Sequence, residues 1–167
     1  MKVIILPQKT SIMVDDEDYD RVNTFTWYSY RHRRTQYVRS TVWDAKRKKH
    51  LHFYLHRILT GAIPGESIDH INGNGLDNRR SNLRFATAHQ NQSNKRLSLS
   101  SRTGFKGVSI DKRRRNTPFR SRIHNLGASI WLGYFHNARD SAIAYDEAAN
   151  RLFGEYAKTN GSMGLLG

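Results

Sequence analysis

The sequence predicts an α+β protein made of two small domains that are joined by a polar linker. Short stretches rich in aromatic and β-branched residues recur along the chain, and such stretches are typical of strands. One long amphipathic helix is expected at residues 138–153, where small and apolar residues recur at helical spacing. Residues 96–103 are basic, rich in serine and without periodicity, so they indicate a linker. A chain of 167 residues can supply two domains of this size.

The first part of the chain is expected to consist of short strands around one acidic turn. The strand-like stretches are Val3–Leu6, Ile12–Val14, Trp27–Tyr30, Gln36–Val42 and Leu51–Leu55. Asp15-Asp16-Glu17-Asp18 indicates the start of a short helix through Asn23, because carboxylates are favourable near a helix N-terminus. Two basic stretches, Arg31-His32-Arg33-Arg34 and Lys46-Arg47-Lys48-Lys49, are interpreted as hairpin tips that are either solvated turns or contacts to phosphate.

Residues 66–95 are expected to fold as strand, loop, strand and helix. Ile68–Ile71 and Leu83–Ala86 are the two predicted strands. Asn72-Gly73-Asn74-Gly75 lies between them, and these residues tolerate the positive φ angles of a tight loop. Thr87, with Gln90 three residues later, predicts a capping box at the start of a helix that runs to about residue 95.

This segment contains the residue types that hydrolysis of a phosphodiester needs. His70 is the candidate base, since an imidazole with a reference pKa of about 6.5 can take a proton from water at neutral pH. Its neighbour Asp69 offers an oxygen ligand for a hard divalent cation. Adjacent side chains of a strand point to opposite faces, so one can bind a metal while the other faces the attacking water. Asn91, early in the predicted helix, would complete the oxygen ligands, with Asn94 as the alternative.

Residues 56–94 resemble the HNH, or ββα-metal, nucleases, in the phage and intron-encoded form in which asparagine replaces the last histidine. The resemblance implies Asp69 and Asn91 as ligands of one divalent ion, Mg²⁺ or Mn²⁺, and His70 as the general base. It also implies that Asn82 fixes the ring of His70. The nuclease domain is then expected over residues 1–95, with its ββα-metal core at about 66–95.

Two further residues of this segment have more modest expected roles. His56 matches a family histidine upstream of the motif, and it is expected to be structural or to lie near the phosphate. Asp77 and Asn78 are expected to staple the loop rather than to bind metal. A zinc site is not expected, because the histidines lack paired spacing and the chain has no cysteine.

The charge of the chain predicts a polyanionic partner. Lys and Arg number 28 against 14 Asp and Glu, and a protein that neutralises phosphates gains affinity by releasing condensed counterions. No long apolar run favours a membrane, and the stretch Met1–Pro7 is too short for a signal peptide. We therefore expect a nucleic acid as the partner, no membrane and a cytoplasmic location. The resemblance to the HNH nucleases implies that the nucleic acid is double-stranded DNA and that the gene belongs to a phage or another mobile element in a bacterial host cell.

A second domain is expected at residues 104–160. The sequences of residues 105–108, 130–135 and 142–149 resemble the plant APETALA2/ethylene-response-factor DNA-binding domain. The resemblance implies a three-stranded antiparallel sheet that packs on one helix and lies in the major groove of DNA. Asn137 is the expected N-cap of that helix and Gly154 its end. The tail, residues 161–167, is expected to be disordered.

Alternation along the strands supports this second domain independently. In the strand Phe119–His124, apolar or small residues alternate with cationic ones, as in a strand with one buried face and one face toward a polyanion. In the next strand Ile130 and Leu132 would face the helix and Trp131 would point outward, to DNA or into a core contact. The candidate DNA contacts are Lys106, Arg113, Arg114, Arg120, Arg122, His124 and Trp131.

These observations predict a metal-dependent, site-specific DNA endonuclease of the HNH homing type, which nicks or cuts double-stranded DNA as a monomer or a weak dimer. The alternative is a non-cleaving DNA-binding regulator on a degenerate nuclease scaffold. The intact set of Asp69, His70, Asn82 and Asn91 argues against that alternative, since a pure binder has no need of it. An RNA-binding protein would fit the charge but would explain neither motif.

Overall fold

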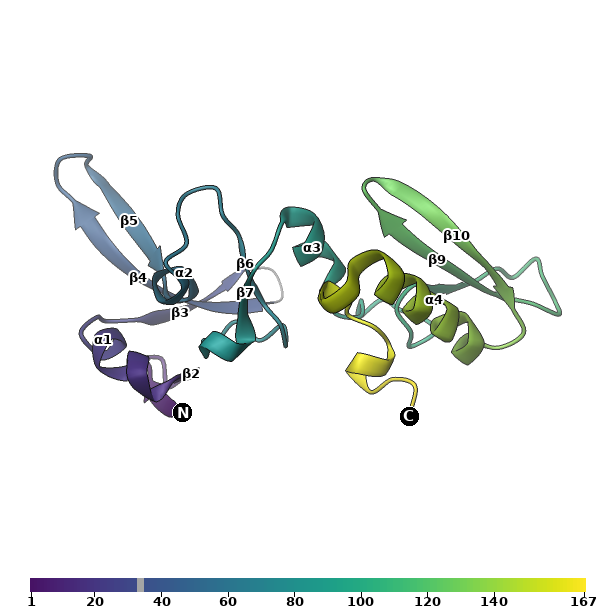
Figure 1. The fold of residues 1–167 in the computed structure, drawn as a ribbon, viewed down its shortest axis with the longest axis horizontal. Helices are drawn as coiled ribbons and strands as arrows, with labels where there is room; N and C mark the ends of the chain where they lie inside the picture. Colours follow the sequence, from purple (N-terminus) through teal and green to yellow (C-terminus); the bar gives the residue numbers. More distant parts are fainter. Residues whose placement is uncertain (33–34) are drawn as a thin grey trace. The chain divides into compact units, whose positions relative to one another are not determined.

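The computed structural model describes residues 1–32 and 35–167 and forms two compact units, Met1–Thr87 and Ala88–Gly167 (Figure 1). The boundary falls before the linker that was expected at residues 96–103, so helix α3 (Ala88–Ser93) groups with the second unit. Residues 96–103 contain neither helix nor strand. No helix in the described ranges is long and apolar enough to cross a membrane. The mixed architecture of small antiparallel sheets and few helices confirms the predicted fold class.

The first unit begins with a hairpin of β1 (Lys2–Ile5) and β2 (Ser11–Val14). A 3-10 turn over Asp16–Asp18 then leads into the short helix α1 (Tyr19–Asn23), as the acidic stretch predicted. The side chains of β2 that face inward, Ile12 and Val14, are fully buried and form the centre of the unit's apolar core.

A three-stranded antiparallel sheet follows, in the order β3 (Tyr28–His32), β4 (Thr35–Asp44) and β5 (Lys49–Tyr54). Val38 and Ser40 of β4 are buried against the core, so alternate positions of the strand face outward. The distal part of the β4–β5 hairpin extends away from the core (Figure 1). Of the first predicted basic tip, Arg33 and Arg34 lie outside the described residues, whereas Lys46-Arg47-Lys48-Lys49 does form the exposed end of the β4–β5 hairpin.

Helix α2 (Leu55–Thr60) was not expected, because its first residue was assigned to the end of a strand. Leu55 and Leu59 lie one turn apart on the buried side of the helix, and this packing stabilises a segment too short to show periodicity. Gly61, in the left-handed conformation, ends it. The chain then forms the strand pair β6 (Ile68–His70) and β7 (Leu83–Phe85), with Asp69 opposite Arg84.

The second unit contains a sheet in the order β10 (Ala128–Phe135), β9 (Phe119–Asn125) and β8 (Val108–Ile110). Helix α4 (Ala138–Phe153) packs on one face of this sheet through Tyr145 and Ala149, which contact Ile123 (Figure 1). Asn137 caps the helix by accepting a hydrogen bond from the backbone N–H of Asp140 (2.8 Å), as expected. The predicted sheet with one covering helix is therefore present in this unit.

The strand β10 contains an irregularity that alternation alone does not reveal. Its register with β9 shifts between Trp131 and Gly133, so that Trp131 lies opposite Arg122 while Tyr134 lies opposite Arg120. A residue inserted in this way changes which side chains share a face. Trp131 points outward, as expected, and Tyr134 joins it on the same face, where the two rings meet edge to face at 4.6 Å.

The C-terminal tail, expected to be disordered, instead contains a 3-10 turn at Gly161–Met163. The fully buried Asn160 anchors it, since its backbone N–H and side-chain amide both donate to Asp146 Oδ1 (2.7 and 2.8 Å). The backbone N–H of Gly161 donates to the other oxygen of the same carboxylate (2.8 Å). One buried acid of α4 thus binds the tail to the second unit.

The turn between β9 and β10 allows a stability prediction. Leu126 has a φ of 48° and is 81% exposed, and Gly127 follows with a φ of 82°. Two successive positive φ angles define a hairpin turn that favours asparagine before glycine, whereas a left-handed leucine costs roughly 1 kcal/mol. We therefore expect Leu126→Asn to raise the free energy of unfolding by about 1 kcal/mol in urea titrations. Leu126→Ala is the control, and an equal gain there would contradict relief of backbone strain.

Candidate active site

Asp69 and His70 are consecutive residues of strand β6 in the first unit, and they are 8% and 5% exposed. Across the strand pair, the guanidinium of Arg84 donates from Nε and Nη2 to Asp69 Oδ2 (3.0 and 2.8 Å). Both partners of this ion pair are nearly buried, so the carboxylate is held in one orientation. The strand thus presents a fixed carboxylate beside an imidazole.

His70 lies among aromatic rings and amides. Its Nε2 is 3.4 Å from Oδ1 of Asn78, and its ring meets those of His56 and Tyr37 at centroid distances of 5.2 and 5.9 Å. Burial is the main cause that lowers the pKa of His70, against smaller opposing effects of Asn78 and Asp69. The imidazole is therefore neutral at pH 7 and has a lone pair that can accept a proton.

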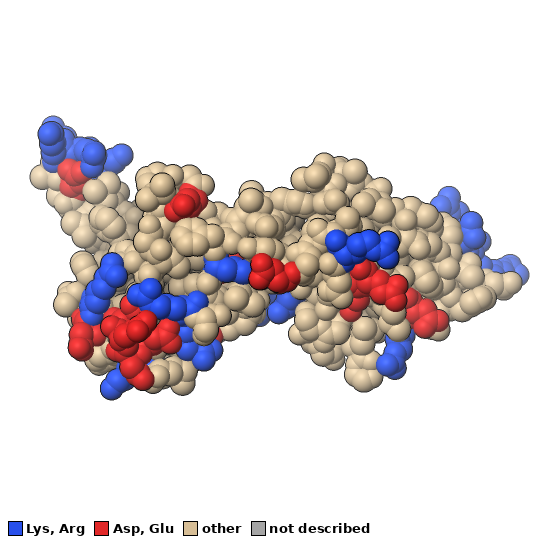
Figure 2. Space-filling model, in the orientation of Figure 1, with Lys and Arg blue, Asp and Glu red and all other residues tan. Residues whose placement is uncertain are grey.

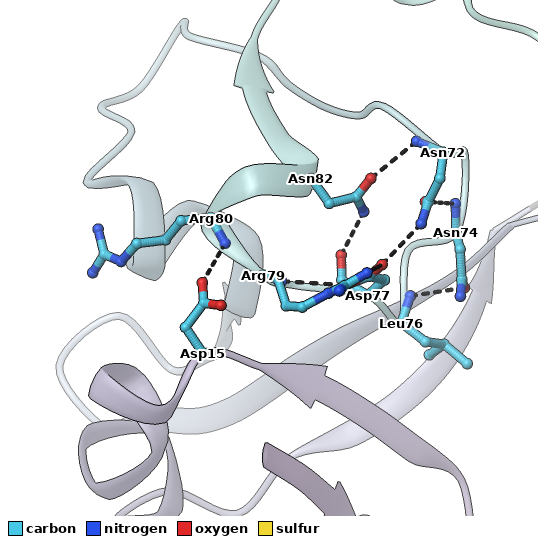
Figure 3. Close-up of polar contacts among 8 residues, drawn as sticks. All are labelled: Asp15, Asn72, Asn74, Leu76, Asp77, Arg79, Arg80 and Asn82. Atoms are coloured by element: carbon cyan, nitrogen blue, oxygen red, sulfur yellow. Dashed lines mark hydrogen bonds and ion pairs between the residues drawn. The ribbon is translucent and has the colours of Figure 1, made fainter. Parts of the chain in front are cut away.

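The loop between β6 and β7 is held by amide and carboxylate side chains (Figure 3). Asn82 donates from Nδ2 to the carbonyl oxygen of Asp77 (2.8 Å), and its Oδ1 accepts from the backbone N–H of Asn72 (3.0 Å). The carboxylate of Asp77 accepts from Arg79 and Asn72, and the Arg79 guanidinium keeps the pKa of Asp77 below its usual range. Asp77 therefore staples the loop, as expected.

The side chain of Asn78 contacts the ring of His70, whereas the sequence pointed to Asn82 for this role. Asn78 is fully buried, with its backbone N–H donating to Met13 of β2 (2.8 Å) and its Nδ2 donating to Gly75 (3.3 Å). Both polar atoms of the Asn82 side chain bind the loop instead. Asn78 was expected only as a staple, and an amide that reaches the ring from an irregular loop leaves no periodic signal in the sequence.

The acidic stretch near the N-terminus also supports the site. Asp15 accepts a hydrogen bond from the backbone N–H of Arg80 (2.7 Å) (Figure 3). The Arg80 guanidinium forms two bonds to Asp18 (2.7 and 2.8 Å). Arg80 begins the 3-10 turn that carries Asn82. These contacts fasten the end of the loop to the start of α1.

His56 projects from α2 into the same aromatic cluster. Its ring lies 5.8 Å from those of Tyr37 and Tyr54, in addition to its contact with His70. Burial, with smaller effects of His70 and Arg57, lowers the pKa of His56 to about 3. Its Nδ1 is buried and has no hydrogen-bond partner among the described residues. Of the two roles that the sequence left open, this environment favours the structural one.

The candidate ligands of a divalent cation are the carboxylate of Asp69 and the amide oxygen of Asn91. Within the part of the chain that the structure describes, no three His, Cys, Asp or Glu side chains gather as a metal-binding group. Asp69 lies on β6 in the first unit, and Asn91 lies on α3 in the second. A carboxylate and an amide oxygen nevertheless suit a hard cation that keeps several of its waters, and they would not suit zinc.

In the second unit, cationic and aromatic side chains share the sheet face opposite α4. Arg120 donates to Ser109 (2.8 Å), and Arg114 lies 3.8 Å above the ring of Tyr134. Arg122 and His124 are exposed on the same face, as the alternation predicted. The neighbouring turn carries Arg113, whose pairing with Asp111 holds the pKa of that carboxyl well below its usual range.

Lys106 differs from the other candidate DNA contacts. Its Nζ donates to the carbonyl oxygens of Ser93 and Lys158, both at 2.8 Å. Burial, the largest cause, lowers the pKa of Lys106 to about 8. This ammonium group therefore joins α3 to the rest of the second unit, and a contact to phosphate would require it to leave these partners.

The antiparallel strand pair of β6 and β7 thus carries Asp69 and His70 and encloses an asparagine-rich loop. Residues 48–93 match the family model of HNH endonucleases, so this segment is similar to the HNH endonuclease domain. The chain is 32% identical over 115 residues to an HNH endonuclease of Acanthamoeba polyphaga mimivirus, described as uncharacterized, which covers 68% of this chain and 58% of that relative.

A second relative matches a shorter stretch. The chain is 50% identical over 36 residues to dehydration-responsive element-binding protein 2D of Arabidopsis thaliana, which covers 22% of this chain and 18% of that protein. The chain spans less than two thirds of the length of each relative. No solved structure matches it significantly.

Proposed function

We propose that this protein is a metal-dependent, site-specific DNA endonuclease of the homing type. The observation that carries the proposal is the fixed pair of Asp69 and His70 on β6, inside a segment that matches the HNH endonucleases. A carboxylate held beside a neutral imidazole suits the activation of water for attack on a phosphodiester.

Each residue has a distinct part in the proposed reaction. His70 takes a proton from water as the new P–O bond forms and the bond to the 3′ oxygen breaks, and Asn78 positions its ring. Asn82 acts through the loop, by joining its two ends. Asp69 would be a ligand of one divalent ion, Mg²⁺ or Mn²⁺, which would supply charge neutralisation at the phosphate. The ion pair with Arg84 orients Asp69 for this role.

The second unit is proposed to bind double-stranded DNA through its sheet. Support comes from the cationic and aromatic face that includes Arg120, Arg122, His124 and Trp131, with Arg113 and Arg114 at its edge. A narrow sheet of this kind fits the major groove, where base edges can be distinguished. Two DNA-binding units on one chain also gain affinity through effective concentration. Lys106 is left out of this set because of its buried contacts.

The test is cleavage of supercoiled plasmid and of phage or host genomic DNA in Mg²⁺, in Mn²⁺ and in EDTA. We expect open-circular or linear products only with a divalent ion, and the product distinguishes nicking by a monomer from concerted cutting. Intact DNA in every arm, together with a gel shift in EDTA, would reject the nuclease in favour of a non-cleaving DNA-binding regulator.

A further inference from the structure

We propose that the outer face of the β3–β4–β5 sheet binds the nucleic acid strand that leads into the active site. The outer face comprises the odd-numbered positions 37–43 of β4, their cross-strand partners on β3 and β5, and the basic tip of the β4–β5 hairpin at residues 46–49. The inference rests on the proposed function, because it assigns the DNA on one side of the scissile phosphate to a surface of the nuclease domain itself.

The alternation of β4 determines which side chains form this face. Val38 is fully buried and Ser40 is 7% exposed, and both lie on the core side. Tyr37, Arg39 and Trp43 therefore project from the opposite side. Their partners across the ladders are aromatic or histidine residues: Tyr30 opposite Tyr37, Tyr54 opposite Arg39, and His50 opposite Trp43.

These side chains form a row of rings with a cation among them. Tyr30 lies 6.0 Å from Tyr37 and 5.8 Å from Tyr54, and the guanidinium of Arg39 lies 4.5 Å from the Tyr30 ring. At the distal end Trp43 meets His50 at 4.9 Å. Aromatic faces interleaved with cations are the surface on which bases and sugars stack while phosphates are neutralised.

The distal part of the hairpin is exposed on both faces. Trp43 is 55% exposed and Val42, on the other side of the strand, 51%. A two-stranded ribbon without packing on either face is marginally stable in water, so this one gains from a partner that covers it. The tip that follows, Lys46-Arg47-Lys48-Lys49, is exposed and basic, and it forms the blue cluster at the end of the β4–β5 hairpin (Figure 2). Its charge complements a polyanion.

The row of rings is continuous with the candidate base. Tyr37, at the proximal end, contacts both His56 and His70, with centroid distances of 5.8 and 5.9 Å. A strand whose phosphate lies at His70 would therefore meet Tyr37 first and Trp43 last. Six residues of β-strand rise about 20 Å, which corresponds to roughly six nucleotides of a duplex at about 3.4 Å each.

The first experiment measures DNA binding by the full chain in EDTA, where cleavage plays no part. Anisotropy of a labelled 30-base-pair duplex is followed at increasing salt for wild type, for Lys46→Gln/Lys49→Gln and for Arg139→Gln. Each lost phosphate contact makes the slope of log K against log salt less steep by about 0.9. The slope of the double variant should therefore be less steep than that of wild type by about 1.8. Arg139, exposed on α4, is the charge control and should leave the slope unchanged. A double variant with the wild-type slope would overturn the inference.

The second experiment uses tryptophan fluorescence. Trp27 is only 3% exposed, so in Trp131→Phe the emission that DNA can quench comes from Trp43. We expect quenching on titration with a duplex or with a single-stranded oligonucleotide, and its loss in Trp43→Phe/Trp131→Phe. Stronger quenching by the single strand would support stacking on unpaired bases, and stronger quenching by the duplex would support sugar and phosphate contact. Equal emission with and without either DNA would overturn the inference.

The two proposals fail separately. A wild type that cleaves DNA, with an unchanged salt slope in Lys46→Gln/Lys49→Gln, overturns the outer-face inference and leaves the endonuclease standing. A wild type that never cleaves, but whose salt slope falls in the double variant, overturns the endonuclease and supports binding at the outer face.

Discussion

His70→Ala is expected to slow DNA cleavage by about 10²- to 10⁴-fold, the usual contribution of a general base. DNA affinity in EDTA should stay at the wild-type value, because the variant removes no cation. Burial keeps the imidazole of His70 neutral, and the side chain of Asn78 contacts its Nε2. The substitution by alanine removes the ring, and with it the nitrogen lone pair that accepts the proton from water. Initial rates of plasmid nicking measure the first quantity, and duplex anisotropy measures the second.

The control for this prediction must separate chemistry from packing, since His70 is 5% exposed and contacts two rings. His70→Gln fills more of the space but offers no base, so it should be as slow as His70→Ala while unfolding closer to the wild-type temperature. Asn78→Ala should reduce the rate less than either, because it loosens the ring without removing it. Cleavage by His70→Ala at the wild-type rate would rule out His70 as the base.

Periodicity was sufficient for most elements of the fold. The helix at Ala138–Phe153 with its cap at Asn137, and the strands of the second sheet, were predicted because propensity, capping and alternation agree there. Helix α2 was missed because six residues carry too little periodicity, and burial of Leu55 and Leu59 determines its conformation. The irregularity at Trp131–Gly133 was missed because it depends on the partner strand.

Within the candidate site, the sequence placed Asp69 and His70 together because they are neighbours in the chain. It could not place the contacts that join distant segments, such as Arg80 with Asp15 and Asp18, since no local pattern records them. The identity of the side-chain amide that contacts His70 could not be predicted for the same reason. Asn78 and Asn82 both lie in the loop, and only the path of the backbone decides which side chain reaches the ring.

The domain boundary illustrates the same limit. Helix α3 directly follows β7 in the motif, so the sequence assigned it to the nuclease domain at residues 1–95. The family match over residues 48–93 includes this helix, whereas no local pattern shows its contacts within the second unit, where Ser93 donates to the carbonyl oxygen of Tyr156 (2.9 Å) and accepts from Lys106 at its own carbonyl (2.8 Å). In the same helix, Nε2 of His89 lies 2.7 Å from Oδ1 of Asn125, and its ring contacts that of Phe153.

The second large effect is expected in acid, and it comes from His56. Burial lowers the pKa of His56 to about 3 in the folded chain, against about 6.5 when unfolded, so between these values only the unfolded chain binds the proton. The free energy of unfolding therefore falls as the pH drops through this window, by up to about 1.4 kcal/mol per pH unit, and is unaffected above it.

Urea unfolding at pH 7 and pH 5 tests this effect. His56→Phe keeps a ring among Tyr37, Tyr54 and His70 but removes the titrating group and its unpartnered Nδ1. The stability difference between the two pH values should shrink by about 2 kcal/mol relative to wild type. His56→Gln should reduce this stability difference by the same amount, because it also removes the group that binds the proton. Its stability should be lower than that of His56→Phe at both pH values, because glutamine does not restore the packing of the ring. If both variants showed the same stability difference between pH 7 and pH 5 as wild type, groups other than His56 would be responsible for the acid sensitivity.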